Sequence, residues 1–235
     1  MHNIYKYTNG KSAMKQINKQ TNKQSTLQNN IQFITAIIVL LCIGIYFSWP
    51  QINVPFRQIT NEVLENVIQM RVNIILALIF LGIGAVISIL ISKHVSSKLR
   101  IILSALMLFT CFFSLSMQTI TFHYTSNYIL LYLSYAFLGG TASGIVLVPT
   151  TNILNTAFKG KKIIGSVIVF GCILTGSFIL GNIINLFAST ENGSWKNIYT
   201  TIAIIMGIII FISSFILKPT NESYVKSMKI EEEEI

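Results

Sequence analysis

The sequence contains no aspartate, and charged residues of all kinds make up only 11% of it. Soluble domains average about 25% charged residues, so this deficit argues against an ordinary soluble domain. Hydrophobic residues account for 52% of the chain. The formal net charge is +9, but the basic residues lie between long apolar runs, and this distribution argues against a nucleic-acid-binding protein. The composition therefore predicts an integral membrane protein.

The sequence also lacks the residue groups that form catalytic and metal sites. Its three cysteines fall singly within apolar segments, with no CxxC motif and no pairing with histidine. We interpret them as small buried hydrophobic residues. There is no metal-ligand cluster, catalytic triad, phosphate-binding loop or nucleotide-binding fingerprint. We therefore expect that the protein is not an enzyme and binds no metal or other cofactor.

Six apolar runs are each long enough for a membrane helix, which needs about 20 mainly apolar residues. None of the runs contains Asp, Glu, Lys or Arg, and none alternates with the period of two that a barrel strand requires. The sequence therefore predicts an all-α membrane protein with a six-helix bundle over residues 31–217. The predicted spans are Ile31–Trp49, Val72–Ser92, Ile101–Phe122, Tyr128–Val148, Ile163–Phe187 and Ile198–Leu217.

The parts of the chain outside the apolar runs are polar and mostly basic. Residues 1–30 hold five lysines and no acidic residue, and we expect a disordered basic tail there. Residues 218–235 are expected to form a second tail with an acidic end. Of the 17 basic residues, 14 fall in these tails and in the loops after the second and fourth spans. The positive-inside rule then places both termini in the cytoplasm, in agreement with an even number of spans.

Glycines are frequent in two of the apolar segments, between Tyr128 and Phe187. A glycine inside a soluble helix costs about 1 kcal/mol relative to alanine, whereas in a membrane small residues let helix backbones approach closely. Gly140 and Gly144 have the spacing of a GxxxG motif. We expect helix packing at five glycines in these segments: Gly140, Gly144, Gly171, Gly176 and Gly181.

Polar residues at the end of the first span and in the fourth span are candidates to line a solute path. Prolines lie near both places, and a proline frees a backbone carbonyl that a cavity can tolerate. Two alternatives stay open: the residues around Trp49 form an aromatic belt at the interface, or the hydroxyl groups bond only to their own helix. The candidate cavity residues are Tyr46, Ser48, Gln51, Asn53, Thr141, Ser143, Pro149, Thr151 and Asn152.

The turn after the second span reads SILISKHVSSKLR. Together with the six helices and the fourth helix rich in glycine and proline, it resembles one half of a transporter of the major facilitator superfamily. The turn motif of that family is G-x-L-x-D-R-x-G-R-R. This sequence keeps basic residues at Lys93, Lys98 and Arg100, whereas Ser88 and Ser92 replace the glycine and the aspartate. The resemblance implies that the three basic residues form a cytoplasmic gate turn.

A narrower resemblance is to the branch of oxalate/formate antiporters and monocarboxylate porters. GGTASGIVLVPTTNILNTAF is similar to the fourth helix of that branch, and KGKKIIGSVIVFGCILTG is similar to the basic turn and glycine-rich helix that follow. The resemblance covers about residues 33–217. It implies the N-terminal half of a transporter, built as a 3+3 inverted repeat. It also implies that the first and fourth helices line the cavity and that the third and sixth face lipid.

One function hypothesis and two alternatives follow. We expect a secondary active transporter, or its N-terminal half, that moves a small organic solute by alternating access. The resemblance implies monocarboxylates or dicarboxylates as the solute class. The expected partners are the lipid bilayer, the solute and a second six-helix bundle, either a separate chain or a second copy. The alternatives are a non-transporting six-helix scaffold or assembly protein, and an inactive truncated transporter.

Overall fold

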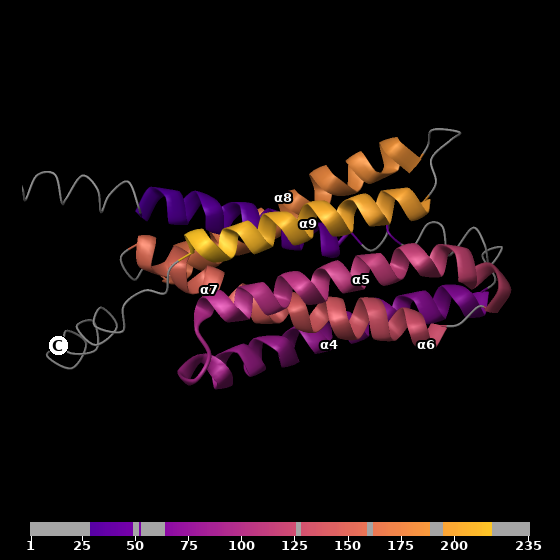
Figure 1. The fold of residues 1–235 in the computed structure, drawn as a ribbon, viewed down its shortest axis with the longest axis horizontal. Coiled ribbons are helices and arrows are strands. Elements are labelled where there is room, and N and C mark those ends of the chain that lie inside the picture. The colour runs from indigo at the N-terminus through magenta and orange to yellow at the C-terminus, as the bar shows by residue number, and fades with distance from the viewer. Residues whose placement is uncertain are drawn as a thin grey trace, which may run out of the picture.

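The structure is a computed structural model that describes residues 29–48, 52, 64–125, 128–158, 162–188 and 195–217. This part of the chain contains helices and short connections and no strand. Figure 1 shows the helices running along a common direction as an elongated bundle. Apart from Asn29 and Asn30, the two predicted tails lie outside the described residues.

The order of the helices follows the order of the predicted spans. The first helix covers Asn29–Tyr46. It is followed by α4 (Leu64–Leu90), the short η1 turn (Ile91–Lys93), α5 (Ser97–Thr125), α6 (Tyr128–Leu131), η2 (Tyr132–Gly139), α7 (Gly140–Ala157), α8 (Lys162–Ala188) and α9 (Trp195–Ile216). The elements α6, η2 and α7 form one continuous helical stretch in which η2 is a π-helix.

Five of these helices are long and apolar enough to cross a membrane: the first helix, α4, α5, the stretch from α6 to α7, and α9. In α8 the apolar part is shorter, Ile163–Ile179. The predicted class, an all-α protein with several membrane-length helices, is therefore confirmed. Within such helices most backbone hydrogen bonds are made internally, as a lipid environment requires.

Several helices begin or end away from the predicted boundaries. The α4 helix begins at Leu64, well before Val72, and α5 begins at Ser97, so that Arg100 lies inside a helix rather than in a turn. The first helix ends at Tyr46, and Trp49 lies outside the described residues. The apolar runs mark the stretch that lipid covers, whereas helical hydrogen bonding continues into the polar surroundings on either side.

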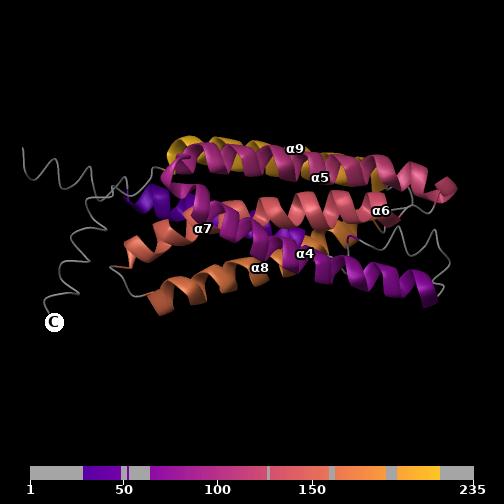
Figure 2. The same ribbon diagram turned by 90° about the horizontal axis from the view of Figure 1, so that it is seen from below.

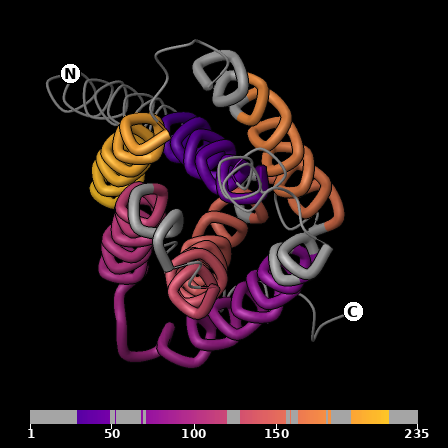
Figure 3. The backbone as a smooth tube through the Cα atoms, turned by 90° about the vertical axis from the view of Figure 1, so that its right-hand side faces the viewer, coloured from indigo at the N-terminus to yellow at the C-terminus, as the bar shows by residue number. Residues whose placement is uncertain are grey.

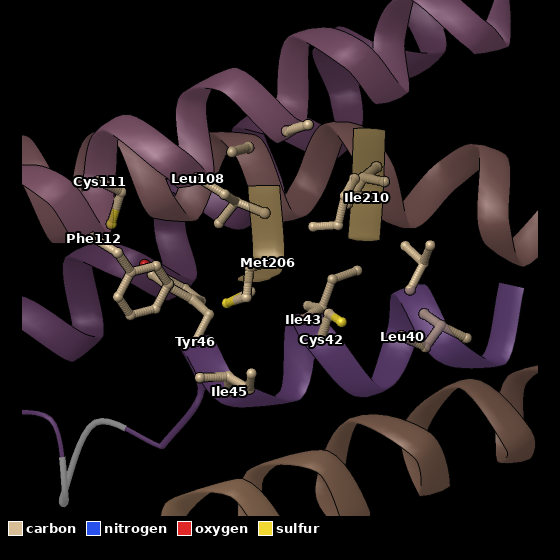
Figure 4. Close-up of a cluster of buried hydrophobic side chains, with 14 of the residues drawn as sticks. Leu40, Cys42, Ile43, Ile45, Tyr46, Leu108, Cys111, Phe112, Met206 and Ile210 are labelled. Carbon is tan, nitrogen blue, oxygen red and sulfur yellow. The ribbon is translucent and has the colours of Figure 1, made fainter. Parts of the chain in front are cut away.

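The first helix and α7 lie in the middle of the bundle. Viewed along the bundle, they lie between the α5–α9 pair on one side and α4 and α8 on the other (Figure 3). Figures 1 and 2 together show α5 and α9 side by side along most of their length. Buried side chains of the first helix, α5 and α9 meet in one apolar core, including Ile43, Leu108, Phe112 and Met206 (Figure 4).

The backbones of α4 and α7 touch at glycines. A Cβ built on Gly140 would lie 2.6 Å from a carbonyl oxygen of α4, and one built on Gly144 would lie 2.6 Å from the amide nitrogen of Ala85. On the other side of the contact, a Cβ on Gly84 would lie 2.8 Å from the Cα of Thr141. Real Cβ atoms do not approach other atoms this closely, so this crossing requires residues without a side chain.

A second glycine crossing joins the first helix to α8. A Cβ on Gly44 would lie 2.8 Å from the Cα of Gly176, and one on Gly176 would lie 3.0 Å from the Cα of Leu41. Gly181 is buried. Gly171 differs, because it is exposed and a Cβ built on it would find nothing within 4 Å in the described part of the chain. The expected helix packing therefore does not occur at Gly171 within the described bundle.

Candidate functional site

Two tyrosines tie the end of the first helix to η2. The Tyr46 hydroxyl donates a hydrogen bond of 2.9 Å to the Tyr135 carbonyl, and the Tyr135 hydroxyl donates to the Tyr46 carbonyl. Their rings stack with centroids 4.5 Å apart, and both side chains are buried. The Tyr46 carbonyl can accept this bond because it lies in the last turn of its helix, where carbonyls have no helical partner.

A third tyrosine and a π-helix belong to the same region. The Tyr199 hydroxyl of α9 donates to the Ile52 carbonyl. In η2, the missing side chain of Gly139 leaves room for the Tyr46 ring and for Cys111, whose Sγ would lie 2.9 Å from a Cβ at this position. We call Tyr46, Tyr135 and Tyr199 the tyrosine cluster. Short π-helical segments are rare and occur frequently at functional sites.

The residue Ser48 fixes the same end of the first helix to α8. Its side chain is fully buried, and its hydroxyl donates a bond of 2.8 Å to the Ser177 carbonyl. The cavity candidates Tyr46 and Ser48 are thus engaged in contacts between helices. Gln51 and Asn53, the two other candidates in this region, lie outside the described residues.

The hydroxyl-bearing candidates of α7 differ in their surroundings. The Thr141 hydroxyl donates to the Phe137 carbonyl one turn earlier, which is the alternative of bonding within the helix. The Ser143 hydroxyl is fully buried and has no hydrogen-bond partner in the described part of the chain. Thr151 is half-buried and Asn152 is exposed. Of these candidates, Thr151 and Asn152 therefore have surface that a partner or a solute can reach.

A hydrogen-bond network surrounds the proline break in α7. Pro149 lies inside the helix and lacks the N–H that would bond to the Ile145 carbonyl. The Ser88 hydroxyl of α4 donates to that carbonyl over 2.9 Å. Arg100 Nη1 of α5 donates to the Ser88 carbonyl over 2.9 Å and to its hydroxyl over 3.1 Å. This proline network, formed by Pro149, Ile145, Ser88 and Arg100, joins three helices at one end of the bundle.

The three predicted gate residues have different environments. Arg100 is 5% exposed, and its Nη2 also donates to the Ser97 hydroxyl over 3.0 Å. A charged group inside an apolar bundle requires such partners, because an unpaired buried charge is expensive. Lys93 and Lys98 are exposed, and the Lys98 ammonium lies 4.1 Å from the centroid of the Phe215 ring. The structure thus separates Arg100, an internal link, from two surface cations.

Two buried amides were not among the sequence candidates. Asn73 of α4 is fully buried, and neither of its amide atoms has a hydrogen-bond partner in the described ranges. Gln118 of α5 donates to the Ser134 hydroxyl over 2.8 Å, but its oxygen is unpaired there. An unpaired buried amide costs several kcal/mol, so Asn73 marks a place where a polar molecule such as water would be stabilised. Its signal in the sequence is a single asparagine in an apolar run.

The described residues contain no group of three or more His, Cys, Asp or Glu side chains that could hold a metal ion. No model of a known protein family matches the chain, and no curated protein matches it. The fold and the site define a multi-pass helical membrane protein whose helices are linked by buried polar groups.

Proposed function

We propose that the chain is one six-helix half of a secondary transporter of the major facilitator type, built as a 3+3 inverted repeat. The pairing of the helices is the observation that carries this proposal. The first helix crosses α8 at Gly44 and Gly176, and α4 crosses α7 at Gly84 and Gly144. A repeat of three helices relates the first helix to the stretch from α6 to α7, α4 to α8, and α5 to α9. Exchanging these partners turns the crossing of the first helix with α8 into the crossing of α7 with α4. The same exchange leaves α5 and α9 paired with each other. An inverted repeat requires such a pattern.

The distribution of exposed surface supports a second bundle on the side of α4 and α8. Only 17% of the most apolar 18-residue segment of α4 is buried, compared with 50% of that segment in α5 and 67% in the stretch from α6 to α7. The α8 helix exposes large side chains, among them Phe170 and Phe178. The family resemblance implies that α5 faces lipid, yet α4 is the more exposed helix. A partner bundle covering α4 and α8 accounts for this difference.

The substrate would then bind between the two bundles. In this half, Tyr46 and Ser48 bond to other helices, and Arg100 is held by Ser88 and Ser97. A carboxylate in a dry site needs a compensating charge or several donors. The partner bundle therefore supplies the charge that pairs with an anionic solute, whereas Thr151 and Asn152 on α7 contribute polar contacts.

Transport in liposomes tests the proposal. The chain alone, shown to be monomeric, is expected to exchange oxalate, formate or lactate at the rate of protein-free liposomes. Saturable exchange is expected only with a second bundle, either another chain or a second copy. Saturable uptake by a demonstrated monomer would contradict the requirement for a partner. Saturable uptake by a dimer of this chain would favour a neutral solute over an anion, because polar groups would supply the whole site.

A non-transporting assembly protein is the second candidate. Three of the candidate cavity hydroxyl groups favour it, because the hydroxyls of Tyr46, Ser48 and Thr141 already donate to backbone carbonyls within the chain. Hydroxyl groups bonded in this way stabilise the bundle and are not needed to bind a solute. An assembly protein would copurify with other membrane subunits, and the isolated complex would show no solute exchange. A transporter half would show exchange that is lost when its partner bundle is removed.

We infer that both termini face the cytoplasm, because the basic residues alternate from loop to loop. Single cysteines at Gly10, Thr125 and Gly160 test this orientation in intact cells with a reagent that does not cross the membrane. Only Thr125→Cys is expected to react from outside. Labelling of Gly160→Cys from outside would contradict this orientation and favour the opposite one.

A further inference from the structure

A shallow groove runs along the exposed surface between α5 and α9. Its volume is about 310 Å³, at the lower end of the range for small-ligand pockets. Gly207 leaves room in it, since a Cβ at this position would lie 3.3 Å from the Phe109 ring. The side chains on either side are exposed and apolar, as lipid-facing side chains are. The lining residues include Leu106, Phe109, Ile204, Gly207, Ile208 and Phe211.

One end of this groove leads to a cation. Phe211, which lines the groove, packs edge-on against Phe215 one turn further along α9, with ring centroids 5.3 Å apart. The Lys98 ammonium lies over the Phe215 ring at 4.1 Å from its centroid. The contact places the beginning of α5 beside the end of α9. The attraction between a cation and an aromatic ring holds the ammonium there.

The distance along α5 from Phe109 in the groove to Lys98 matches the thickness of one leaflet of a bilayer. Phe109 and Lys98 are eleven positions apart on α5. This separation corresponds to about 16 Å along a helix axis, and half of the hydrocarbon core of a bilayer is about 15 Å thick. An acyl chain that lies in the groove with its end near Phe109 would therefore bring the headgroup phosphate to the level of Lys98.

Among the described residues, the charge at this end of the bundle favours an anion. Glu65 is the one acidic residue in the described ranges, and it lies in the first turn of α4. Lys98 lies near the other end of α4, because its neighbour Arg100 bonds to Ser88. The Arg100 guanidinium is already engaged, and the exposed Lys93 lies outside α5 and α9. Among the described cations, the exposed Lys98 ammonium is therefore the one beside the groove that a ligand can reach.

We propose that the groove between α5 and α9 binds one acyl chain of an anionic phospholipid, and that Lys98 binds its phosphate. A zwitterionic lipid carries its own cation close to the phosphate and interacts less favourably with a lysine. A lysine near a membrane surface attracts an anionic lipid by about 1 kcal/mol, which corresponds to a preference of about fivefold. The site is independent of any transport activity.

Native mass spectrometry of the purified full chain tests the headgroup part of this proposal. The chain is mixed with equal amounts of phosphatidylglycerol and phosphatidylcholine that carry the same acyl chains. The first bound lipid is expected to be phosphatidylglycerol by about fivefold. Lys98→Gln is expected to abolish this preference and Lys98→Arg to keep it. The control Lys93→Gln removes another exposed cation, outside α5 and α9, and is expected to change nothing.

A pair of tryptophan variants tests the acyl-chain part. Ile208→Trp places a large ring in the groove and is expected to remove the tightly bound lipid. Ile205→Trp is the matched control, because Ile205 is 50% exposed on the same helix but does not line the groove. Both variants must elute from size-exclusion chromatography at the same volume as the unmodified protein, which shows that they are folded. Soluble glycerol phosphate, which has the headgroup without the chain, is expected not to displace the lipid.

Four results would overturn the proposal. These are equal binding of the two lipids, an unchanged preference in Lys98→Gln, retention of the lipid in Ile208→Trp, and displacement by glycerol phosphate alone. The conservative Lys98→Arg variant and the control Ile205→Trp separate loss of the site from loss of the fold. None of these measurements depends on solute exchange, so they stand apart from the transport assay.

Discussion

The helices α7 and α8 are both rich in glycine and free of acidic residues, but they occupy opposite kinds of environment. The α7 helix lies in the middle of the bundle, and its glycines Gly140 and Gly144 meet the backbone of α4. The α8 helix is largely exposed. Its Gly176 contacts the first helix, whereas no atom of the described residues lies within 4 Å of a Cβ built on Gly171. Similar composition therefore does not mean similar tolerance to substitution.

The largest effect is expected at Gly144. A Cβ at this position would overlap the Leu81 carbonyl and lie 2.6 Å from the Ala85 nitrogen, and α7 is too enclosed to shift. Gly144→Ala should therefore destabilise the protein by about 3 kcal/mol, as overpacking does. The measurement is the fraction of protein that stays monodisperse in detergent after heating. If the midpoint temperature of this loss equals that of the wild type, the crossing between α4 and α7 has room for a methyl group.

A smaller loss is expected at Gly176. The added Cβ would again meet a backbone, with the Leu41 Cα at 3.0 Å. Because much of α8 is exposed, this helix can move outward and relieve part of the overlap. Gly176→Ala should therefore cost about 1–2 kcal/mol in the same heating assay. If it were as harmful as Gly144→Ala, α8 would be held in place from its exposed side.

The hydrogen bonds that support α7 at Pro149 allow a third test. Ser88→Ala removes the donor to the Ile145 carbonyl and an acceptor of Arg100. The expected loss is about 1 kcal/mol, because measured hydrogen bonds between membrane helices are modest. Ser92→Ala is the matched control, since within the described ranges the exposed Ser92 hydroxyl bonds only to the Ile89 carbonyl of its own turn. Equal midpoints for the two variants would argue against a supporting role for the proline network.

The smallest effect, and one of opposite sign, is expected at Gly171. Nothing in the described chain lies within 4 Å of a Cβ at this position. Alanine favours a helix over glycine by up to about 1 kcal/mol, so Gly171→Ala should leave stability unchanged or raise it slightly. A clear loss of stability or of assembly would instead indicate that a second bundle packs against this face of α8.

The apolar runs were sufficient to predict where the helices are, because a run of about 20 uncharged residues is stable in a membrane only as a helix. The boundaries were less predictable, as α4 and α5 show by extending past the apolar stretch. The tyrosine cluster could not be derived from the sequence, since Tyr46 and Tyr135 are far apart in the chain. Nor could the burial of Arg100, which depends on Ser88 being within reach.

The sequence by itself determined the class of the protein and the rough position of each helix, since both follow from the length and polarity of its segments. It did not determine which glycines meet another backbone, because Gly144 and Gly171 both lie within long uncharged runs. The tertiary structure distinguishes them by the helix that lies opposite each one. It also pairs the carbonyl left free by Pro149 with Ser88. Such contacts join distant segments, and local sequence carries no information about which segments will meet.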